Sequence, residues 1–130
     1  MTGTINVALL GLGRIGQQFT ASLVEHIKEG DKPIKIVAVA ERDINSPAAK
    51  RFAADGVPVY TDALEIVKLG EAVDIIFDLT GVPSVRKAMR DKLQDLDNFH
   101  TVIVPEVIAR LMWSFLEEGV ALNGPVRSGY

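Results

Sequence analysis

The sequence predicts an α/β protein built on a doubly wound parallel sheet with the strand order 3-2-1-4-5. Short, continuous apolar segments rich in Val and Ile alternate along the chain with segments whose apolar residues recur at helical spacing. This alternation is typical of parallel strands joined by crossover helices that cover both faces of a sheet. The 130 residues fit a single domain, which we expect over residues 1–122, followed by a turn-rich tail over 123–130.

Five segments are predicted as strands, and they are Ile5–Leu10, Ile34–Ala40, 57–60, 73–79 and 101–104. Residues that cap or open helices follow them, namely Ser46 with Pro47, Thr61 with Asp62, Pro83 and Pro105. Turn residues end the helical segments, namely Gly30, Asp55 with Gly56, Gly70 and Gly119. Right-handed crossovers then place the first strand in the centre beside the fourth, and a ligand crevice is expected between their carboxyl ends.

Composition excludes several classes of function. A formal net charge of -3 disfavours binding to nucleic acid or to anionic lipid, and the absence of cysteine excludes disulfides and thiol chemistry. No apolar run approaches the roughly 18 residues of a membrane span, and the N-terminus lacks the basic region of a signal peptide. We therefore expect a cytoplasmic domain with no nucleic-acid or membrane partner.

The strongest motif is a glycine-rich turn between the first strand and a helical segment, and its residues are Gly11, Leu12, Gly13, Arg14, Ile15 and Gly16. In such a turn the first glycine allows a tight bend, the second lets a pyrophosphate approach the backbone, and the third lets the helix pack closely on the strand. The amides that open the helix then bind phosphate oxygens. The alternative is a turn that needs glycine for backbone reasons alone.

An acidic residue follows at the distance expected for binding a ribose. Glu41 ends the second strand, 25 residues after Gly16, where a carboxylate accepts hydrogen bonds from the adenosine ribose hydroxyls. Arg42 beside it is able to pair with a 2′-phosphate. The pattern favours NAD as the cofactor and leaves NADP open.

With these residues in place, positions 5 to about 104 resemble the NAD(P)-binding Rossmann domain shared by homoserine dehydrogenase, dihydrodipicolinate reductase and the glucose-fructose oxidoreductase group. The segment from Asp74 to Thr80 looks like the fourth strand of the reductase, which ends in Asp-Phe-Thr. The resemblance implies that Thr80, with Gly81 beside it, borders the nicotinamide side of the cofactor. It also implies tolerance of both NADH and NADPH.

The sequence departs from this resemblance at two points. The oxidoreductase group carries a catalytic lysine at the end of the fifth strand, whereas the matching stretch here is Ile103, Val104 and Pro105. In all three families a substrate domain follows the nucleotide domain, but here only the tail follows Leu122. We therefore expect the isolated chain to bind cofactor without catalysing a reaction.

Several polar residues receive structural interpretations. Asp78 is expected to cap the turn that follows the fourth strand, with a perturbed catalytic carboxylate as the alternative. His26 and His100 are interpreted as boundary residues, since neither has an obvious acidic partner in the sequence. A basic run is interpreted as a solvated helix face, and it comprises Arg86, Lys87, Arg90 and Lys92.

The last helix, over residues 105–118, carries more apolar surface than packing on a sheet requires. Its apolar residues span about 240° of its circumference, whereas one sheet-facing stripe needs about 100°. We expect Ile108, Leu111, Met112 and Phe115 to face the sheet, which leaves Trp113 for a homodimer or a neighbouring domain. The alternative is that the tail folds back over Trp113.

Three functions remain open at this point. The first is a free-standing dinucleotide-binding module with a sensory or regulatory role. The second is the nucleotide-binding part of an oxidoreductase whose catalytic part is absent from this chain. The third is a Rossmann-shaped interaction domain that binds no ligand.

Overall fold

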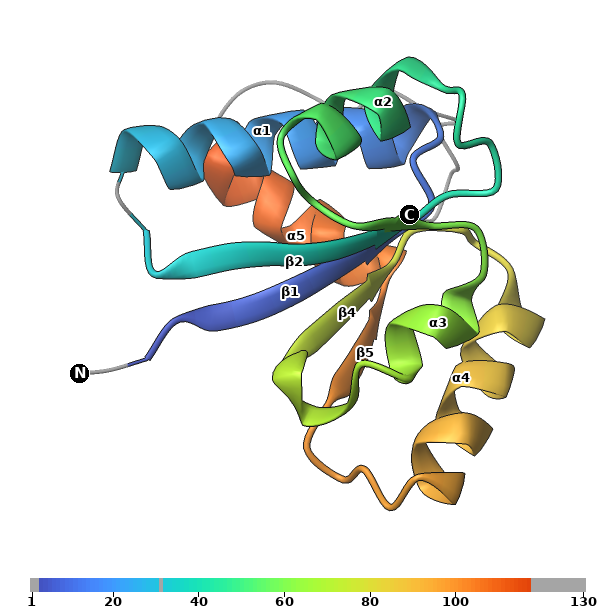
Figure 1. Ribbon diagram of the computed structural model, residues 1–130. Helices are drawn as coiled ribbons and strands as arrows, with labels where there is room; N and C mark the ends of the chain where they lie inside the picture. Colours follow the sequence, from blue (N-terminus) through green and yellow to red (C-terminus); the bar gives the residue numbers. More distant parts are fainter. Residues whose placement is uncertain (1–2, 31, 118–130) are drawn as a thin grey trace, which may run out of the picture.

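A computed structural model describes residues 3–30 and 32–117. Its centre is one sheet of five strands in the order β3-β2-β1-β4-β5, in which every neighbouring pair is parallel (Figure 1). The strands are β1 (Ile5–Leu10), β2 (Ile34–Ala40), β3 (Val59–Tyr60), β4 (Ile75–Asp78) and β5 (Val102–Pro105). The predicted fold class and strand order are confirmed.

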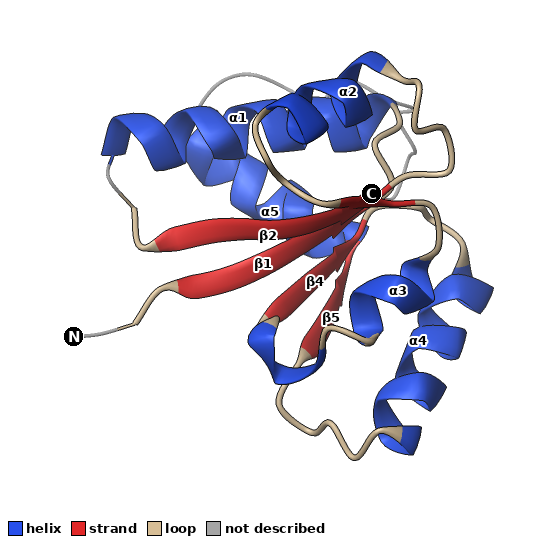
Figure 2. Cartoon of the chain, viewed as in Figure 1, coloured by secondary structure: helices blue, strands red, loops and turns tan. Residues whose placement is uncertain are grey.

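Helices cover both faces of the sheet (Figure 2). One face carries α1 (Arg14–Gly30), α2 (Pro47–Ala54) and α5 (Glu106–Leu116). The other carries α3 (Ala63–Val67) and α4 (Pro83–Asp95), with a short 3-10 turn, η1 (Gly70–Ala72), before β4. This is the doubly wound arrangement, in which the crossover helices change face once, as the chain returns from β3 to β4 beside the central β1.

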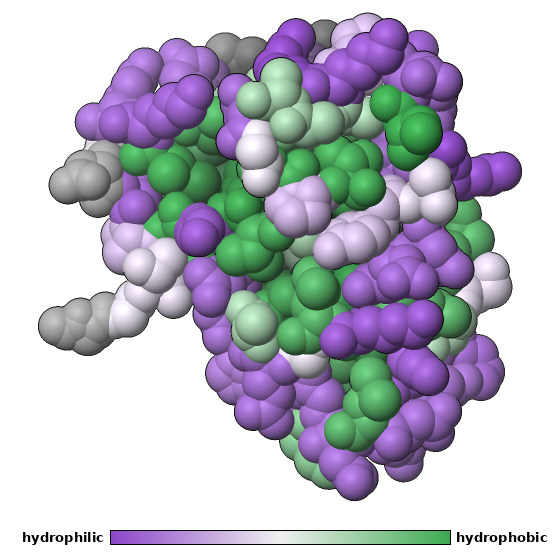
Figure 3. Space-filling model, viewed as in Figure 1, coloured by the Kyte–Doolittle hydropathy of each residue, from purple (hydrophilic) through white to green (hydrophobic). Residues whose placement is uncertain are grey.

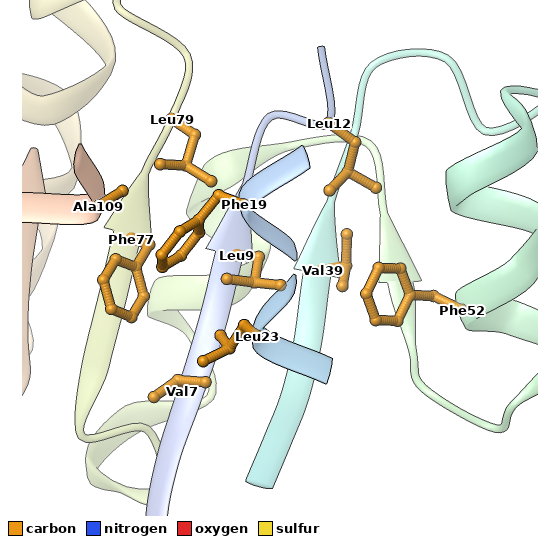
Figure 4. Close-up of a cluster of buried hydrophobic side chains, with 10 residues drawn as sticks. All are labelled: Val7, Leu9, Leu12, Phe19, Leu23, Val39, Phe52, Phe77, Leu79 and Ala109. Carbon is orange, nitrogen blue, oxygen red and sulfur yellow. The ribbon is translucent and has the colours of Figure 1, made fainter. Parts of the chain in front are cut away.

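The two layers follow from the alternation of side chains along each strand. In β1, Val7 and Leu9 point to the α1 side, and Ala8 and Leu10 point to the α3–α4 side. Figure 4 shows the first cluster, where the ring of Phe19 from α1 lies against Phe77 of β4 with centroids 5.3 Å apart. Burying one side chain of this size contributes about 2 kcal/mol to stability.

The helix starts predicted at Ser46 with Pro47 and at Pro83 agree with the structure, whereas the N-cap of α3 is Asp62 rather than Thr61 before it. Ser46 accepts a hydrogen bond from Ala49 N (3.2 Å), Asp62 accepts one from Leu64 N (2.9 Å), and Pro83 is the first residue of α4. Pro105 differs, because it is the last residue of β5 and the N-cap of α5 rather than a residue of its first turn. The predicted stop at Gly119 and the predicted tail lie outside the described residues.

The strand limits also differ from the predictions. Of the predicted 57–60, only Val59–Tyr60 forms β3, because Val57 N donates to Phe52 O at the end of α2 (2.9 Å) and Pro58 has no N–H. The predicted 73–79 shortens to Ile75–Asp78, and the predicted 101–104 shifts to Val102–Pro105. The limits of β1 and β2 agree with the prediction, since both strands are continuous apolar runs.

The surface is polar over most of the helices. Figure 3 shows hydrophilic residues above and below an apolar band that runs between the α1–α2 layer and the α3–α4 layer. Among the described helices, none has the length and apolar character needed to cross a bilayer.

Candidate functional site

All five strands end at the same edge of the sheet, and a cleft of about 560 Å³ lies there. It is lined by residues that follow β1, β2, β3 and β4, with Val85 from α4. Five predicted site residues are in its wall, namely Gly11, Gly13, Glu41, Arg42 and Thr80. A second hollow of about 350 Å³ shares Gly13 and Leu79 with it and adds Arg14, Ile15, Gly16 and Glu106.

The three glycines of the turn have different surroundings. Gly11 has φ +89°, and a Cβ there would lie 3.1 Å from Thr80 N. A Cβ on Gly16 would lie 2.3 Å from the Gly11 carbonyl oxygen, so only glycine lets α1 approach the end of β1 this closely. A Cβ on Gly13 would meet no atom within 4 Å. The space in front of Gly13 is therefore open to a ligand.

The start of α1 offers backbone donors to that space. Gln17 N donates to Gly13 O (2.7 Å), so the helical hydrogen bonds begin there. The amides of Arg14, Ile15 and Gly16 precede this bond and have no acceptor within the helix. Such amides, at the positive end of the helix dipole, bind anionic oxygens. Leu12 contributes differently, because its side chain is buried in the core and its backbone N–H donates to Glu41.

The carboxylate of Glu41 is fixed by two backbone amides. Its Oε1 accepts a hydrogen bond from Leu12 N (2.7 Å) in the glycine turn, and its Oε2 accepts one from Asp43 N (2.9 Å). Each oxygen keeps a lone pair, so the carboxylate is still able to accept from hydroxyl groups. Glu41 N also donates to Tyr60 O (2.8 Å), and this bond brings the turn after β3 to the same end of the cleft.

The opposite wall is built by Thr80, which is held by a buried carboxylate. Asp78 Oδ1 accepts hydrogen bonds from Thr80 N (3.0 Å) and Thr80 Oγ1 (2.6 Å), and Thr80 Oγ1 in turn accepts one from Val82 N (3.1 Å). The expectation that Asp78 shapes this turn is confirmed. Gly81 lies in the turn with φ +69° and is not among the residues that line the cleft.

One residue of the basic run has a role that the sequence analysis missed. Asp78 is fully buried, and its Oδ2 lies 3.9 Å from Arg86 Nε without a hydrogen-bond partner of its own. The interpretation of Arg86 as part of a solvated face is therefore wrong, because its guanidinium is the counter-charge of a buried carboxylate. Asp78 and Arg86 are eight residues apart and separated by a turn, so no local sequence pattern predicted that they form a pair. Lys87 does fit the surface interpretation, in an exposed pair with Asp91 (3.0 Å).

Both histidines have acidic partners distant in sequence. His100 Nε2 lies 2.6 Å from Asp74 Oδ1, at the opposite edge of the sheet from the cleft. The backbone hydrogen bond from Asn6 and the side-chain hydrogen bond from His100 lower the pKa of Asp74. His26 Nδ1 lies 3.9 Å from Glu117 Oε2, and Ser22 Oγ donates to the same oxygen (2.6 Å). Neither group reaches the cleft, so both are structural contacts.

The last helix contradicts the expectation for Trp113. Its side chain is only 8% exposed, whereas Val107, Leu111 and Phe115 are 57%, 55% and 78% exposed. The buried positions of α5 are Ala109 and Trp113. Ile108 and Met112 pack against the core on the α1 side, as predicted, but the prediction that Leu111 and Phe115 face the sheet is wrong. Because eight residues of this helix are apolar, their spacing alone did not fix which side meets the sheet. An apolar stripe is exposed on α5, but it runs through Val107, Leu111 and Phe115.

Comparisons with known proteins identify a family of dinucleotide-binding domains. A family model described as the NAD-binding domain of homoserine dehydrogenase matches residues 11–120. A search of curated proteins finds no match.

Solved structures of homoserine dehydrogenases share the fold. The enzyme from S. aureus at pH 7.5 is 22% identical with a TM-score of 0.63, over 100% of this chain and 34% of that chain. The enzyme from Thiobacillus denitrificans is 24% identical with a TM-score of 0.57, over 81% of this chain and 24% of that chain. The chain thus spans about a third or less of the length of these structures.

Proposed function

Because the chain belongs to the family of homoserine dehydrogenase NAD-binding domains, we propose that it is a dinucleotide-binding module with a sensory or regulatory role. NAD(P) binding itself follows from the family. The sensory role is the proposal, in which occupation of the cleft by the dinucleotide is read by a partner.

The observation that supports dinucleotide binding in this cleft, on which the sensory role depends, is the open space at Gly13. A purely structural glycine turn needs Gly11 for its positive φ and Gly16 for close packing, but it has no need of glycine at position 13. The pyrophosphate would lie there, on the amides that open α1, and the adenosine ribose would lie on Glu41. Thr80, fixed by Asp78, would form the wall on the nicotinamide side.

The chain offers few groups for catalysis. A bound nicotinamide would supply hydride transfer, but a reaction also needs a group that moves a proton on the substrate. Val104 and Pro105 end β5 where the oxidoreductases of similar sequence have a lysine, and Asp78 is committed to Thr80. Within this proposal the isolated chain binds cofactor and does not turn over.

The second candidate is the nucleotide-binding part of an oxidoreductase, and the length comparison favours it. Homoserine dehydrogenases of similar fold are about three times as long as the aligned chain, so their further residues would supply the substrate site. A reaction catalysed only when a second polypeptide is added would support this candidate over the sensory module.

A partner is expected on α5 in either case. The exposed stripe of Val107, Leu111 and Phe115 follows i, i+4, i+8 spacing and presents one continuous apolar face. We propose that a second copy or a neighbouring domain covers it. If the chain bound no dinucleotide, the exposed stripe would favour the third function, a protein-interaction domain without a ligand.

The experiment is a calorimetric titration of the purified chain with NAD, NADH, NADPH and ADP. We expect saturable binding of at least one dinucleotide and its loss in Gly13→Val. Absence of binding to every nucleotide, or a Gly13→Val protein that binds as the parent does, would contradict the proposal. Steady turnover with a panel of aldehydes and hydroxy acids would contradict the non-catalytic role.

A further inference from the structure

The ribose end of the cleft is unusually rich in carboxylates that are already bound to backbone amides. Glu41, Arg42, Thr61 and Asp62 line this end together, because Glu41 N pairs with Tyr60 O and brings the end of β3 beside the end of β2. Two of these four side chains are acidic. Asp62 is not part of the glycine motif, and it is not the acidic residue predicted to bind the ribose, which is Glu41. The proposed function gives Asp62 no role.

We infer that Asp62, together with Glu41, selects NAD(H) against NADP(H) by excluding the 2′-phosphate from this end of the cleft. The inference rests on the proposed function, because it assumes that the adenosine ribose lies on Glu41. Under this inference the chain responds to NAD(H) and not to NADP(H), and Asp62 is a specificity-determining residue.

The first argument is the supply of hydrogen-bond donors. A 2′-phosphate carries about two negative charges and needs N–H or O–H donors. Three backbone amides at this end are already occupied, since Leu12 N and Asp43 N donate to Glu41 and Leu64 N donates to Asp62. A phosphate arriving here would meet the carboxylates that have taken these donors.

The second argument is that both carboxylates are held in place. Glu41 is fixed by hydrogen bonds of 2.7 and 2.9 Å, and Asp62 Oδ1 is fixed as the N-cap of α3 by a hydrogen bond of 2.9 Å. Each carboxylate would have to break hydrogen bonds to the backbone in order to swing away from this position.

Arg42 is the group that would favour binding of a 2′-phosphate. Among the described residues that line the cleft, it is the only cationic side chain, and it is exposed. One mobile guanidinium faces two fixed carboxylates, so the local charge remains negative when Arg42 is included. A like-charged phosphate is therefore disfavoured, whereas the two hydroxyls of a NAD ribose find acceptors.

The test compares affinities for NADH and NADPH in the parent and in Asp62→Asn, measured by calorimetry or by nicotinamide fluorescence. Asparagine is a good N-cap, so this variant keeps the start of α3 and removes only the charge. We expect the parent to prefer NADH by about tenfold or more, the change that one or two nearby charges produce. Asp62→Asn should bind NADPH several-fold more tightly, so that the ratio of the affinities for NADH and NADPH falls by the same factor or more.

Two further measurements separate charge from shape. Asp62→Ser, a second capping residue, should behave as Asp62→Asn does. Raising the ionic strength should narrow the gap between NADH and NADPH in the parent more than in Asp62→Asn, because salt screens the charge that the variant lacks.

A parent that prefers NADPH or binds both dinucleotides equally would overturn this inference and leave the proposed function standing. Equal changes in the affinities for NADH and NADPH in both variants would also overturn it, because Asp62 would then be structural only. A chain that binds neither dinucleotide overturns the proposed function and this inference together.

Discussion

Gly13 and Gly16 are three residues apart in one turn, yet a Cβ atom would meet open space at the first and a backbone oxygen at 2.3 Å at the second. The two positions therefore separate ligand binding from folding. Gly16→Ala should lower the free energy of unfolding by about 1–3 kcal/mol, because α1 has to move away from β1. Gly13→Val should cost no more than about 1 kcal/mol, the usual effect of changing the residue before a helix.

Urea denaturation of the two variants, read by circular dichroism, checks this contrast. In NADH titrations Gly13→Val should stay folded and lose binding. Similar losses of stability in both variants would show that Gly13 is also a packing glycine.

The buried pair of Asp78 and Arg86 gives a second prediction at the scale of residues. Arg86→Gln removes the counter-charge of a carboxylate that is fully buried, and an uncompensated buried charge should lower the free energy of unfolding by about 1–3 kcal/mol. Lys87→Gln is the matched control, since Lys87 and Asp91 form an exposed pair whose loss costs at most about 1 kcal/mol. Equal stability of the two variants in thermal and urea unfolding would contradict the role given to Arg86.

Among elements, α5 presents two different faces. Trp113→Ala should destabilise the fold by about 3–5 kcal/mol because its side chain packs in the core. Phe115→Glu, at a position that is 78% exposed, should leave the stability of the monomer nearly unchanged and should weaken association.

Light scattering over a range of concentrations measures this association. A parent that dimerises and a Phe115→Glu protein that does not would place a second copy on the stripe. A parent that stays monomeric at the highest concentration would exclude the homodimer and leave a neighbouring domain as the partner.

The amino ends of β4 and β5 carry a pH-dependent contact. Folding lowers the pKa of Asp74 through the hydrogen bonds from Asn6 and His100, so its contribution to stability is present above the ordinary Asp pKa of about 3.9. The contribution is lost as the pH falls through the lowered folded pKa. Asp74→Asn should therefore lose less stability than the parent between pH 6 and pH 3.

Urea unfolding at several pH values measures this difference, with Asp95→Asn as an exposed control on α4. The control should follow the parent. Parallel curves for the parent and Asp74→Asn would show that the bonds to Asp74 contribute nothing in acid.

At the level of helices and strands, the sequence predicted those limits that depend on neighbouring residues in the chain. The limits of β1 and β2 followed from their apolar runs, and the start of α2 followed from Ser46 and Pro47. The sequence did not predict which side of α5 is exposed. Because apolar residues occupy most of the helix circumference, their spacing does not show which side packs against the sheet. The rotation of α5 about its own axis is set by the path of the chain from β5 into the helix.

For the candidate site, the sequence brought together the glycine turn, Glu41, Arg42 and Thr80, which the structure gathers in one cleft. It missed Asp62 as a neighbour of Glu41, and it missed the partners of Asp78, His100 and His26. These contacts join residues on different strands and helices. Since no local pattern links them, only the packing of the elements reveals them.

At the scale of the whole molecule, the parallel sheet separates function from support. The carboxyl edge gathers the cleft, the opening amides of α1 and the carboxylates of Glu41 and Asp62. The amino edge carries hydrogen bonds such as those of Asp74 with Asn6 and His100. The groove between α1 and α2, about 510 Å³, contains none of the glycine motif. The account therefore predicts one dinucleotide site, at the carboxyl edge.

The most direct test of that claim is a titration of the isotope-labelled chain with NADH, followed by backbone amide chemical shifts. We expect saturable shifts at Gly11, Gly13, Gly16, Glu41 and Thr80, and none at His100 or Asp74. Shifts confined to the α1–α2 groove or to the α5 stripe, or no shifts at a saturating concentration, would contradict the central claim.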